Sequence, residues 1–354
     1  MIIGVNKFHI MRYSILILGK HMRKIGINNF RFKGAPWKDQ LSLAQKIDQL
    51  GFNSISMGES WGEDSLTSLA QIATVTSNIK IGTSIVPTYG RTPANLAMTA
   101  LNMDKMSEGR FFLGLGASGK AVIEGFHGEK FEKPLSRMRE YINIIRLAMN
   151  NEKLDNDGEF FKTSRFRLQF ESYRNDLPIY IASLSPASLK MTGELADGWL
   201  PIYLVPTNME HSLNLIKEGA KTKNRQLSDI KLSPQVSIYV TDNHKEAFDR
   251  ERPHIAFYIG GMGIFYHEYM HRIGFGSESD KIREAYLNRD RDKAAELVTD
   301  EMVAAMTIIG TQNECSDQMD IFFNAGIDEV RLVFNEPNFE SYVKSIESVS
   351  ELIQ

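Results

Sequence analysis

Short apolar runs alternate with longer amphipathic segments along most of this chain. One buried helix face is marked by apolar residues at three- and four-residue intervals, namely Leu41, Ala44, Ile47 and Leu50. Gly51 follows directly, as expected for a glycine that ends a helix in the left-handed conformation. The pattern therefore predicts repeated units of one strand and one helix.

Eight segments have the short, apolar and β-branched character of strands. They are residues 24–29, 53–58, 79–86, 110–116, 177–183, 198–202, 232–240 and 329–334. The helical segments between and after them are 37–50, 65–77, 93–107, 134–150, 186–196, 208–223, a long region at 245–325, and 339–353. Eight parallel strands can close into a barrel or form an open doubly wound sheet, and periodicity does not separate these folds. The number of strands favours the barrel.

Two strand exits have the composition of anion-binding loops. Ligands bind at the carboxyl ends of barrel strands, so these exits are candidate sites. The strand at 110–116 leads into Gly116, Ala117, Ser118 and Gly119, where glycine permits close approach and successive N–H groups can face a phosphate. The strand at 177–183 leads into Ala182, Ser183, Leu184 and Ser185, at the start of a helix. The alternatives are a plain turn at the first exit and simple capping by Ser185 at the second.

Two further loops carry side chains suited to catalysis. Glu59 and Trp61 follow the second strand, and together they offer a carboxylate and an indole to a flat ring. The alternative is a solvated acid beside a tryptophan packed on the rim. His127 lies in E-G-F-H-G, where a loop histidine can reach a substrate or cofactor, although it can equally order its own loop through a hydrogen bond. Arg137 and Arg139 open the next helix, and one of them can meet a negatively charged ligand.

A literal H-E-x-x-H motif occurs at His267–His271. On a helix its two histidines share one face and are suited to zinc, with Glu268 as a base. No third ligand follows at a familiar spacing, so we expect no metal site. Gly260, Gly261 and Gly263 instead predict a break between helices near the mouth of the site.

Length, composition and charge describe a globular chain. Its 354 residues suit one α/β barrel with an insertion, and a net charge of -3 argues against a nucleic-acid surface. A single cysteine, Cys315, excludes an internal disulfide framework and favours the cytoplasm. The apolar run from Tyr13 to Gly19 is too short to span a bilayer, and a signal peptide is the alternative interpretation of this run. We expect residues 1–22 to be a poorly ordered extension, with Met22 as an alternative start, and residues 23–354 to form the barrel domain.

Two segments of the chain resemble a known family. Residues 110–141 are similar to the deazaflavin-dependent branch of the bacterial-luciferase-like oxidoreductases, which have a Gly-x-Ser-Gly loop, an E-G-x-H-G turn and a K/R-P-L-x-R-x-R-E-Y helix start. Residues 177–199, including T-G-E-L-A-D-G, resemble the corresponding region of methylenetetrahydromethanopterin reductases. The resemblance covers residues 23–354.

The resemblance implies a luciferase-like (β/α)8 barrel with a helical insertion before the last strand. It also implies an oxidoreductase that transfers a hydride between coenzyme F420 and a small organic substrate. Ser84 and Ile85 match a non-proline cis peptide that backs the coenzyme ring in related enzymes. Gly116 to Gly119 and Ala182 to Ser185 match loops around the ring edge, side chain and phosphate. Glu59 or His127 is then the proton donor or the group that positions the substrate.

The alternatives use the same barrel. One is an FMN-dependent monooxygenase, one is a non-catalytic flavin-binding barrel, and a narrower version of the main hypothesis is methylenetetrahydropterin reduction. Many relatives have an Asp-His pair where this chain has Glu59-Ser60, so a mechanism that requires that histidine does not transfer. We expect a homo-oligomer that binds neither nucleic acid nor membrane.

Overall fold

The core of the molecule is a closed barrel of parallel strands. The computed structural model describes residues 22–353, and the expected N-terminal extension lies outside them apart from Met22. The barrel strands are β1 (Ile25–Asn28), β2 (Ser54–Met57), β3 (Lys80–Thr83), β5 (Phe111–Gly116), β8 (Ile179–Ile181), β9 (Gly198–Trp199), β10 (Lys231–Leu232) with β11 (Gln235–Val240), which together fill one position, and β13 (Val330–Val333). β1 pairs with both β2 and β13, and a bridge between Ile202 and Gln235 completes the circle. This architecture confirms the predicted (β/α)8 barrel.

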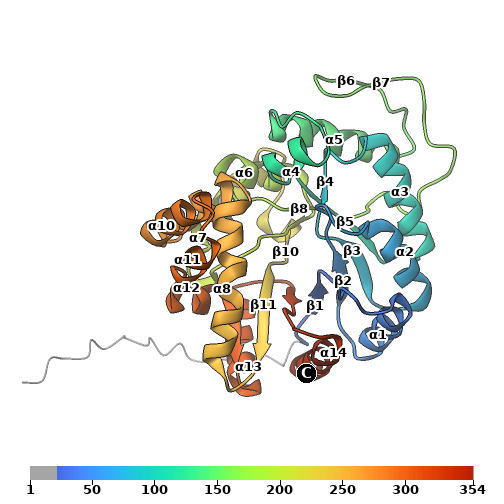
Figure 1. Cartoon of the computed structure of the whole chain (residues 1–354). Helices are drawn as coiled ribbons and strands as arrows, with labels where there is room; N and C mark the ends of the chain where they lie inside the picture. The colour runs from blue at the N-terminus through green and yellow to red at the C-terminus, as the bar shows by residue number, and fades with distance from the viewer. Residues whose placement is uncertain (1–21, 354) are drawn as a thin grey trace, which may run out of the picture.

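Helices surround the barrel, as Figure 1 shows. They are α1 (Trp37–Gln49), α2 (Ser65–Val75), α3 (Pro93–Met106), α5 (Pro134–Met149), α6 (Pro186–Leu195), α7 (Glu210–Lys221), α13 (Gln312–Asn324) and α14 (Phe339–Ser350), with short 3-10 turns at η1 (Pro206–Asn208), η2 (Leu227–Asp229) and η3 (Glu351–Ile353). Side-chain caps fix several starts: Asp64 accepts from the Thr67 N–H, and Thr311 and Glu314 form a capping box. Within residues 22–353, no helix combines the length and apolar character needed to cross a bilayer.

The long region predicted as helical is more divided than the sequence suggested. It contains α8 (His244–Gly261), α9 (Ile264–Arg272), α10 (Gly276–Leu287), α11 (Arg291–Glu296) and α12 (Asp300–Met306), followed by the strand β12 (Thr307–Gly310). β12 pairs with the second half of β11, while β13 pairs with the first half. The prediction missed β12 because a four-residue apolar run cannot be separated from a helical segment by periodicity.

Other differences are local. Two predicted strands are each divided in two: β4 (Val86–Pro87) follows a break after β3, and Pro234, which has no N–H, separates β10 from β11. The short helix α4 (Lys120–Gly125) and the antiparallel pair β6 (Asn156–Asp157) and β7 (Lys162–Thr163) were not predicted. The break predicted from Gly260, Gly261 and Gly263 is confirmed, because α8 ends at Gly261 and Gly263 has a φ of 91°.

A buried cation lies inside the barrel. The Arg331 side chain on β13 is fully buried and donates to the Ser233 carbonyl at 3.0 Å and to the side chains of Asn28 and Ser56 at 3.4 and 3.3 Å. Burial lowers the pKa of Arg331 to about 10, so the guanidinium remains charged at neutral pH. This one side chain therefore connects β1, β2, β13 and the β10–β11 junction.

Helices α6 and α7 pack with their backbones in close contact. A Cβ atom added to Gly193 would lie 1.9 Å from the Ile216 carbonyl oxygen, and one added to Gly219 would lie 1.9 Å from the Lys190 carbonyl oxygen. Neither glycine is needed for a positive φ. The first glycine of the T-G-E-L-A-D-G segment, Gly193, therefore serves helix packing.

We predict that Gly193→Ala lowers the free energy of unfolding by about 2–4 kcal/mol, because overpacking against rigid backbone typically costs 1–3 kcal/mol and sometimes more. Urea unfolding monitored by circular dichroism measures the change. Gly125→Ala is the matched control, since nothing lies within 4 Å of its added Cβ. Equal stability of the two variants would contradict the packing argument.

Candidate active site

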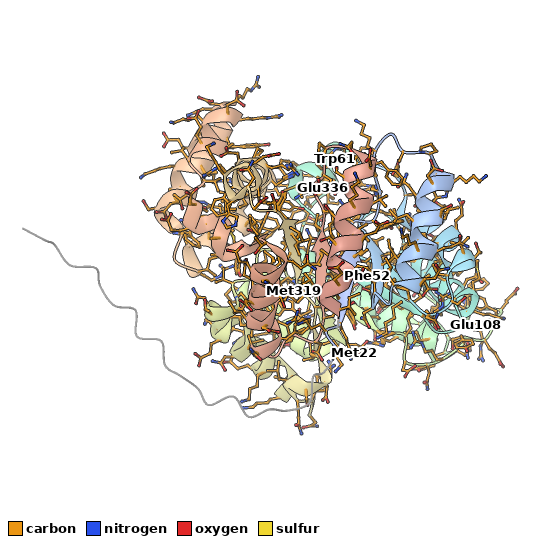
Figure 2. All side chains as sticks on the ribbon, turned by 90° about the horizontal axis from the view of Figure 1, so that it is seen from below. Met22, Phe52, Trp61, Glu108, Met319 and Glu336 are labelled. Atoms are coloured by element: carbon orange, nitrogen blue, oxygen red, sulfur yellow. The ribbon has the colours of Figure 1, made fainter. Side chains whose placement is uncertain are left out.

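A large cavity opens at the carboxyl ends of the barrel strands. Its volume is about 760 Å³, which suits a small-molecule or cofactor site. Figure 2 shows the corresponding end of the barrel: Trp61 and Glu336, which follow strands, lie at the opposite end from Met22 and Glu108, which precede them. The cavity is lined by all ten residues predicted to bind a cofactor, namely Ser84, Ile85, Gly116, Ala117, Ser118, Gly119, Ala182, Ser183, Leu184 and Ser185.

One wall of the cavity is built from the third strand. The peptide bond between Ser84 and Ile85 is cis, as the family resemblance implied. The Glu59 N–H donates to the Ile85 carbonyl at 2.9 Å, which ties the exits of β2 and β3 together. A Cβ on Gly58 would lie 2.7 Å from the Ser84 oxygen, and one on Gly116 would lie 2.8 Å from Ile85 side-chain atoms. The two glycines therefore allow the neighbouring exits to pack against this wall.

Small polar groups and the cation Lys133 form a further part of the lining. Ser185 caps α6 by accepting from the Ser188 N–H at 3.3 Å, so the capping interpretation is correct, and both serines also line the cavity. Ser118, in the glycine loop, has a φ of 61°, which lies in the left-handed region of the backbone. Lys133 lines the same cavity, and its ammonium group contacts Glu159 at 2.5 Å.

The two arginines proposed from the sequence, Arg137 and Arg139, make their contacts outside the cavity. The Arg137 guanidinium lies 4.3 Å from the centre of the Tyr89 ring and donates to the Thr88 carbonyl, while Arg139 pairs with Glu194. Neither arginine lines the cavity. Lys133, which begins the K-P-L-S-R helix start, was not assigned to the site from the sequence, where only the two arginines of this motif were proposed as cofactor contacts.

Glu59 lines the cavity but is firmly anchored. Its carboxylate accepts from Arg91 at 2.5 and 3.1 Å and from both the N–H and the hydroxyl of Ser65 at 3.0 Å. Arg91 also pairs with Asp64. Burial opposes ionisation of Asp64, but hydrogen bonds from Thr67 and the Arg91 charge lower the pKa of its carboxyl below the usual value. Because Glu59 is surrounded by donors, the arrangement suits positioning better than proton donation.

His127 does not reach the cavity. Its ring packs edge-on against Phe126 with centroids 5.1 Å apart, and a Cβ on Gly90 would lie 3.2 Å from its Cε1. Its Nε2 is buried and has no hydrogen-bond partner within residues 22–353. The expectation that His127 joins Glu59 at the site is not met, because the unpredicted helix α4 separates the glycine loop from this histidine.

The insertion supplies residues that sequence reasoning did not assign to the site. Tyr258 and Met262 of the α8 region and Phe265 and Tyr266 of α9 line the cavity. Burial raises the pKa of both tyrosines, so both phenols are neutral at pH 7 and can donate hydrogen bonds. The sequence did not reveal these residues, because contacts between a barrel loop and an insertion more than a hundred residues later leave no short-range pattern in the sequence.

A second, smaller cavity adjoins the first. Its volume is about 370 Å³, and it shares Trp61 and Met262 with the main cavity. The other lining residues are mainly apolar: Ala121, Val122, Gly125, Phe126, Phe257 and Gly261. Trp61 packs edge-on against Phe257 with centroids 6.5 Å apart, at the boundary between the two spaces.

The structure brings the H-E-x-x-H histidines to a third residue. His267, His271 and Asp280 place one ligand atom each within 4.8 Å of one another, whereas the sequence offered no third ligand at a familiar spacing. This group is separate from the cavity lining.

A parallel barrel with a glycine- and serine-lined cavity at its carboxyl end is the architecture of a barrel enzyme that uses a cofactor. Sequence comparison then narrows the class: the profile of the luciferase-like monooxygenase family matches residues 11–329. The chain belongs to the luciferase-like monooxygenase family, which confirms the resemblance found in the sequence.

Individual relatives agree with this assignment. A protein of Mycobacterium tuberculosis that carries the name of a coenzyme F420-dependent oxidoreductase is 30% identical over 322 residues, covering 86% of this chain and 93% of the relative. The 5,10-methylenetetrahydromethanopterin reductase of Methanolobus tindarius is 27% identical, covering 81% and 87%. The solved structure of the coenzyme F420-dependent tetrahydromethanopterin reductase of Methanopyrus kandleri superposes with a TM-score of 0.79 at 24% identity, covering 94% and 98%.

We predict that Glu59→Gln lowers the free energy of unfolding by about 1–3 kcal/mol, because Arg91 loses a charge-assisted bidentate partner that is only 12% exposed. Chemical denaturation measures the change. Glu63→Gln is the control: this carboxylate is 70% exposed and lies 3.7 Å from Arg31, so its loss should cost less than about 0.5 kcal/mol. If both variants have the same free energy of unfolding as the wild type, the hydrogen bonds of Glu59 do not contribute to stability.

Proposed function

We propose that this protein is a coenzyme F420-dependent oxidoreductase that transfers a hydride between the deazaflavin and a small organic substrate. The observation that carries the proposal is the convergence of the Ser84–Ile85 wall with the glycine and serine exits in one cavity. The names of the relatives from Mycobacterium tuberculosis and Methanolobus tindarius support the same cofactor class.

The residues present fit such a cofactor. Gly116 and Gly119 form a cradle that side chains would fill, since a Cβ on Gly119 would lie 3.3 Å from the Met262 carbonyl oxygen. Ser84 and Ile85 would back the ring, and the Gly116 to Gly119 and Ala182 to Ser185 loops would hold its edge, side chain and phosphate. When bound, the deazaflavin supplies two-electron hydride chemistry at C5.

The protein's own groups would orient the substrate and stabilise the charge that develops on it. Glu59 remains our candidate for positioning through the Arg91-anchored loop, and we do not retain His127 because of its place outside the cavity. Tyr266 is the better candidate for donating a hydrogen bond to the reacting group, since burial raises the pKa of its phenol, which stays neutral and lines the cavity. The smaller apolar cavity beyond Trp61 offers room for an apolar part of the substrate.

Fluorescence titration of the purified protein with F420 and with FMN tests the cofactor assignment. We expect F420 to bind at micromolar concentration or below and more tightly than FMN. Lys133→Gln should weaken F420 binding about 10-fold, since one charged contact is worth roughly 1.4 kcal/mol. Lys130→Gln is the control, because Lys130 pairs with Glu132 outside the cavity lining. Tighter binding of FMN would favour the monooxygenase alternative, and binding of neither would overturn the proposal.

Once a substrate is found, Tyr266→Phe should lower kcat by about 10²-fold while F420 affinity stays unchanged, because a hydrogen bond to developing charge is strongest in the transition state. Single-turnover absorbance measurements separate the two quantities. Tyr342→Phe is the control, since the Tyr342 hydroxyl is buried without a partner in the described chain and lies outside the cavity. An unchanged kcat in Tyr266→Phe would remove this residue from the mechanism.

A further inference from the structure

The helices of the insertion bring together three side chains that the proposed oxidoreductase function does not use. His267 and His271 lie one turn apart on α9, and Asp280 lies on α10. The Asp280 Oδ1 atom is 2.9 Å from His271 Nε2 and 3.4 Å from His267 Nε2. The alternative to a metal site is a simple hydrogen-bonded ion pair between two histidines and one carboxylate.

The distances fit a small tetrahedral metal ion. Zinc bonds of about 2.0–2.1 Å at tetrahedral angles place neighbouring ligand atoms roughly 3.4 Å apart. The three ligand atoms here all lie within 4.8 Å of one another, so small side-chain adjustments would complete three corners of the tetrahedron. Water would occupy the fourth corner, because the side chains of His271 and Asp280 are 45% and 60% exposed.

The surroundings hold the two rings in place. The Nδ1 atom of His267 lies 2.9 Å from the hydroxyl of Ser279, which is fully buried, so this bond can fix the ring with Nε2 turned toward Asp280. Gly276 lies directly against the other ring: an added Cβ would be 2.5 Å from His271 Nδ1. Gly276 has no positive φ, so the need for glycine here comes from the histidine.

The group sits where a metal would stiffen the wall of the cavity. α9 carries Phe265 and Tyr266 into the cavity lining, and α10 is tied to the α8–α9 junction by Arg283, which donates to the Gly263 carbonyl at 3.0 Å. A link between α9 and α10 would therefore restrain the segment that bears both aromatic residues.

We propose that His267, His271 and Asp280 bind one divalent transition-metal ion of the zinc type, which clamps α9 to α10. Two imidazoles and one carboxylate favour zinc over magnesium, which prefers oxygen ligands. The role is structural, and this proposal differs from the expectation from sequence that the motif binds no metal. The site does not depend on the identity of the cofactor.

Isothermal titration of the chelator-treated full chain with Zn²⁺ tests the proposal. We expect one saturable site at micromolar affinity or tighter, no comparable site for Mg²⁺, and a rise in Tm of about 2–4 °C at saturating Zn²⁺. His271→Ala and Asp280→Asn should each weaken binding at least 10-fold and abolish the rise in Tm. His211→Ala, which removes an exposed histidine on α7, should leave both unchanged.

Gly276→Ala provides a variant that keeps every ligand atom. It should weaken zinc binding by displacing the His271 ring, with the helical circular dichroism of the wild type retained. The proposal is overturned if wild type shows no saturable zinc binding, or if Asp280→Asn and His271→Ala bind as tightly as His211→Ala.

Discussion

The charge of Arg331 in the barrel interior is the constraint on which the rest of the site depends. A fully buried guanidinium costs several kcal/mol of desolvation unless its donors are satisfied, and removal of partners from such a group commonly costs about 3–5 kcal/mol. The Ser233 carbonyl and the side chains of Asn28 and Ser56 meet this demand from three different strand segments. Since Asn28 and Arg331 also line the cavity, the interaction that joins these strand segments also fixes the cavity's floor.

Close backbone approach then sets the walls above this floor. Glycine at positions 58, 116 and 119 allows the exits of β2 and β5 to contact the Ser84–Ile85 wall and the insertion with no intervening side chains. The Arg91 bridge between Glu59 and Asp64 holds the β2 exit from the outer side. The cavity thus owes its shape to hydrogen bonds and backbone packing.

The sequence predicted those parts that have local signals. Buried strand runs, helix spacing and the number of strands indicated the barrel, and the glycine and serine strand exits indicated the cavity-lining residues Gly116 to Gly119 and Ala182 to Ser185. Ser84 and Ile85 were implied only by the family resemblance. The features that were not predicted are either too short or depend on long-range contacts. β12 has four residues, and α4 is one short helix that separates His127 from the glycine loop. Tyr266 lines the cavity from the insertion, far along the chain from the barrel loops. The same limit applied to His267 and His271, because their third neighbour, Asp280, comes from a separate helix.

This division between barrel and insertion has a functional consequence. The floor and walls come from strands that the barrel itself holds rigid, which suits the binding of a cofactor in one orientation. The aromatic residues Tyr258, Phe265 and Tyr266 come from helices with their own apolar cluster, built around Ile259, Met270 and other buried residues. Leu184 of the serine loop packs against that cluster, and Arg272 of α9 donates to the Leu184 carbonyl at 3.0 Å. Because the insertion supplies these aromatic residues to the cavity and also contacts a cofactor loop, it is the part of the chain best placed to determine how a substrate lies against the cofactor.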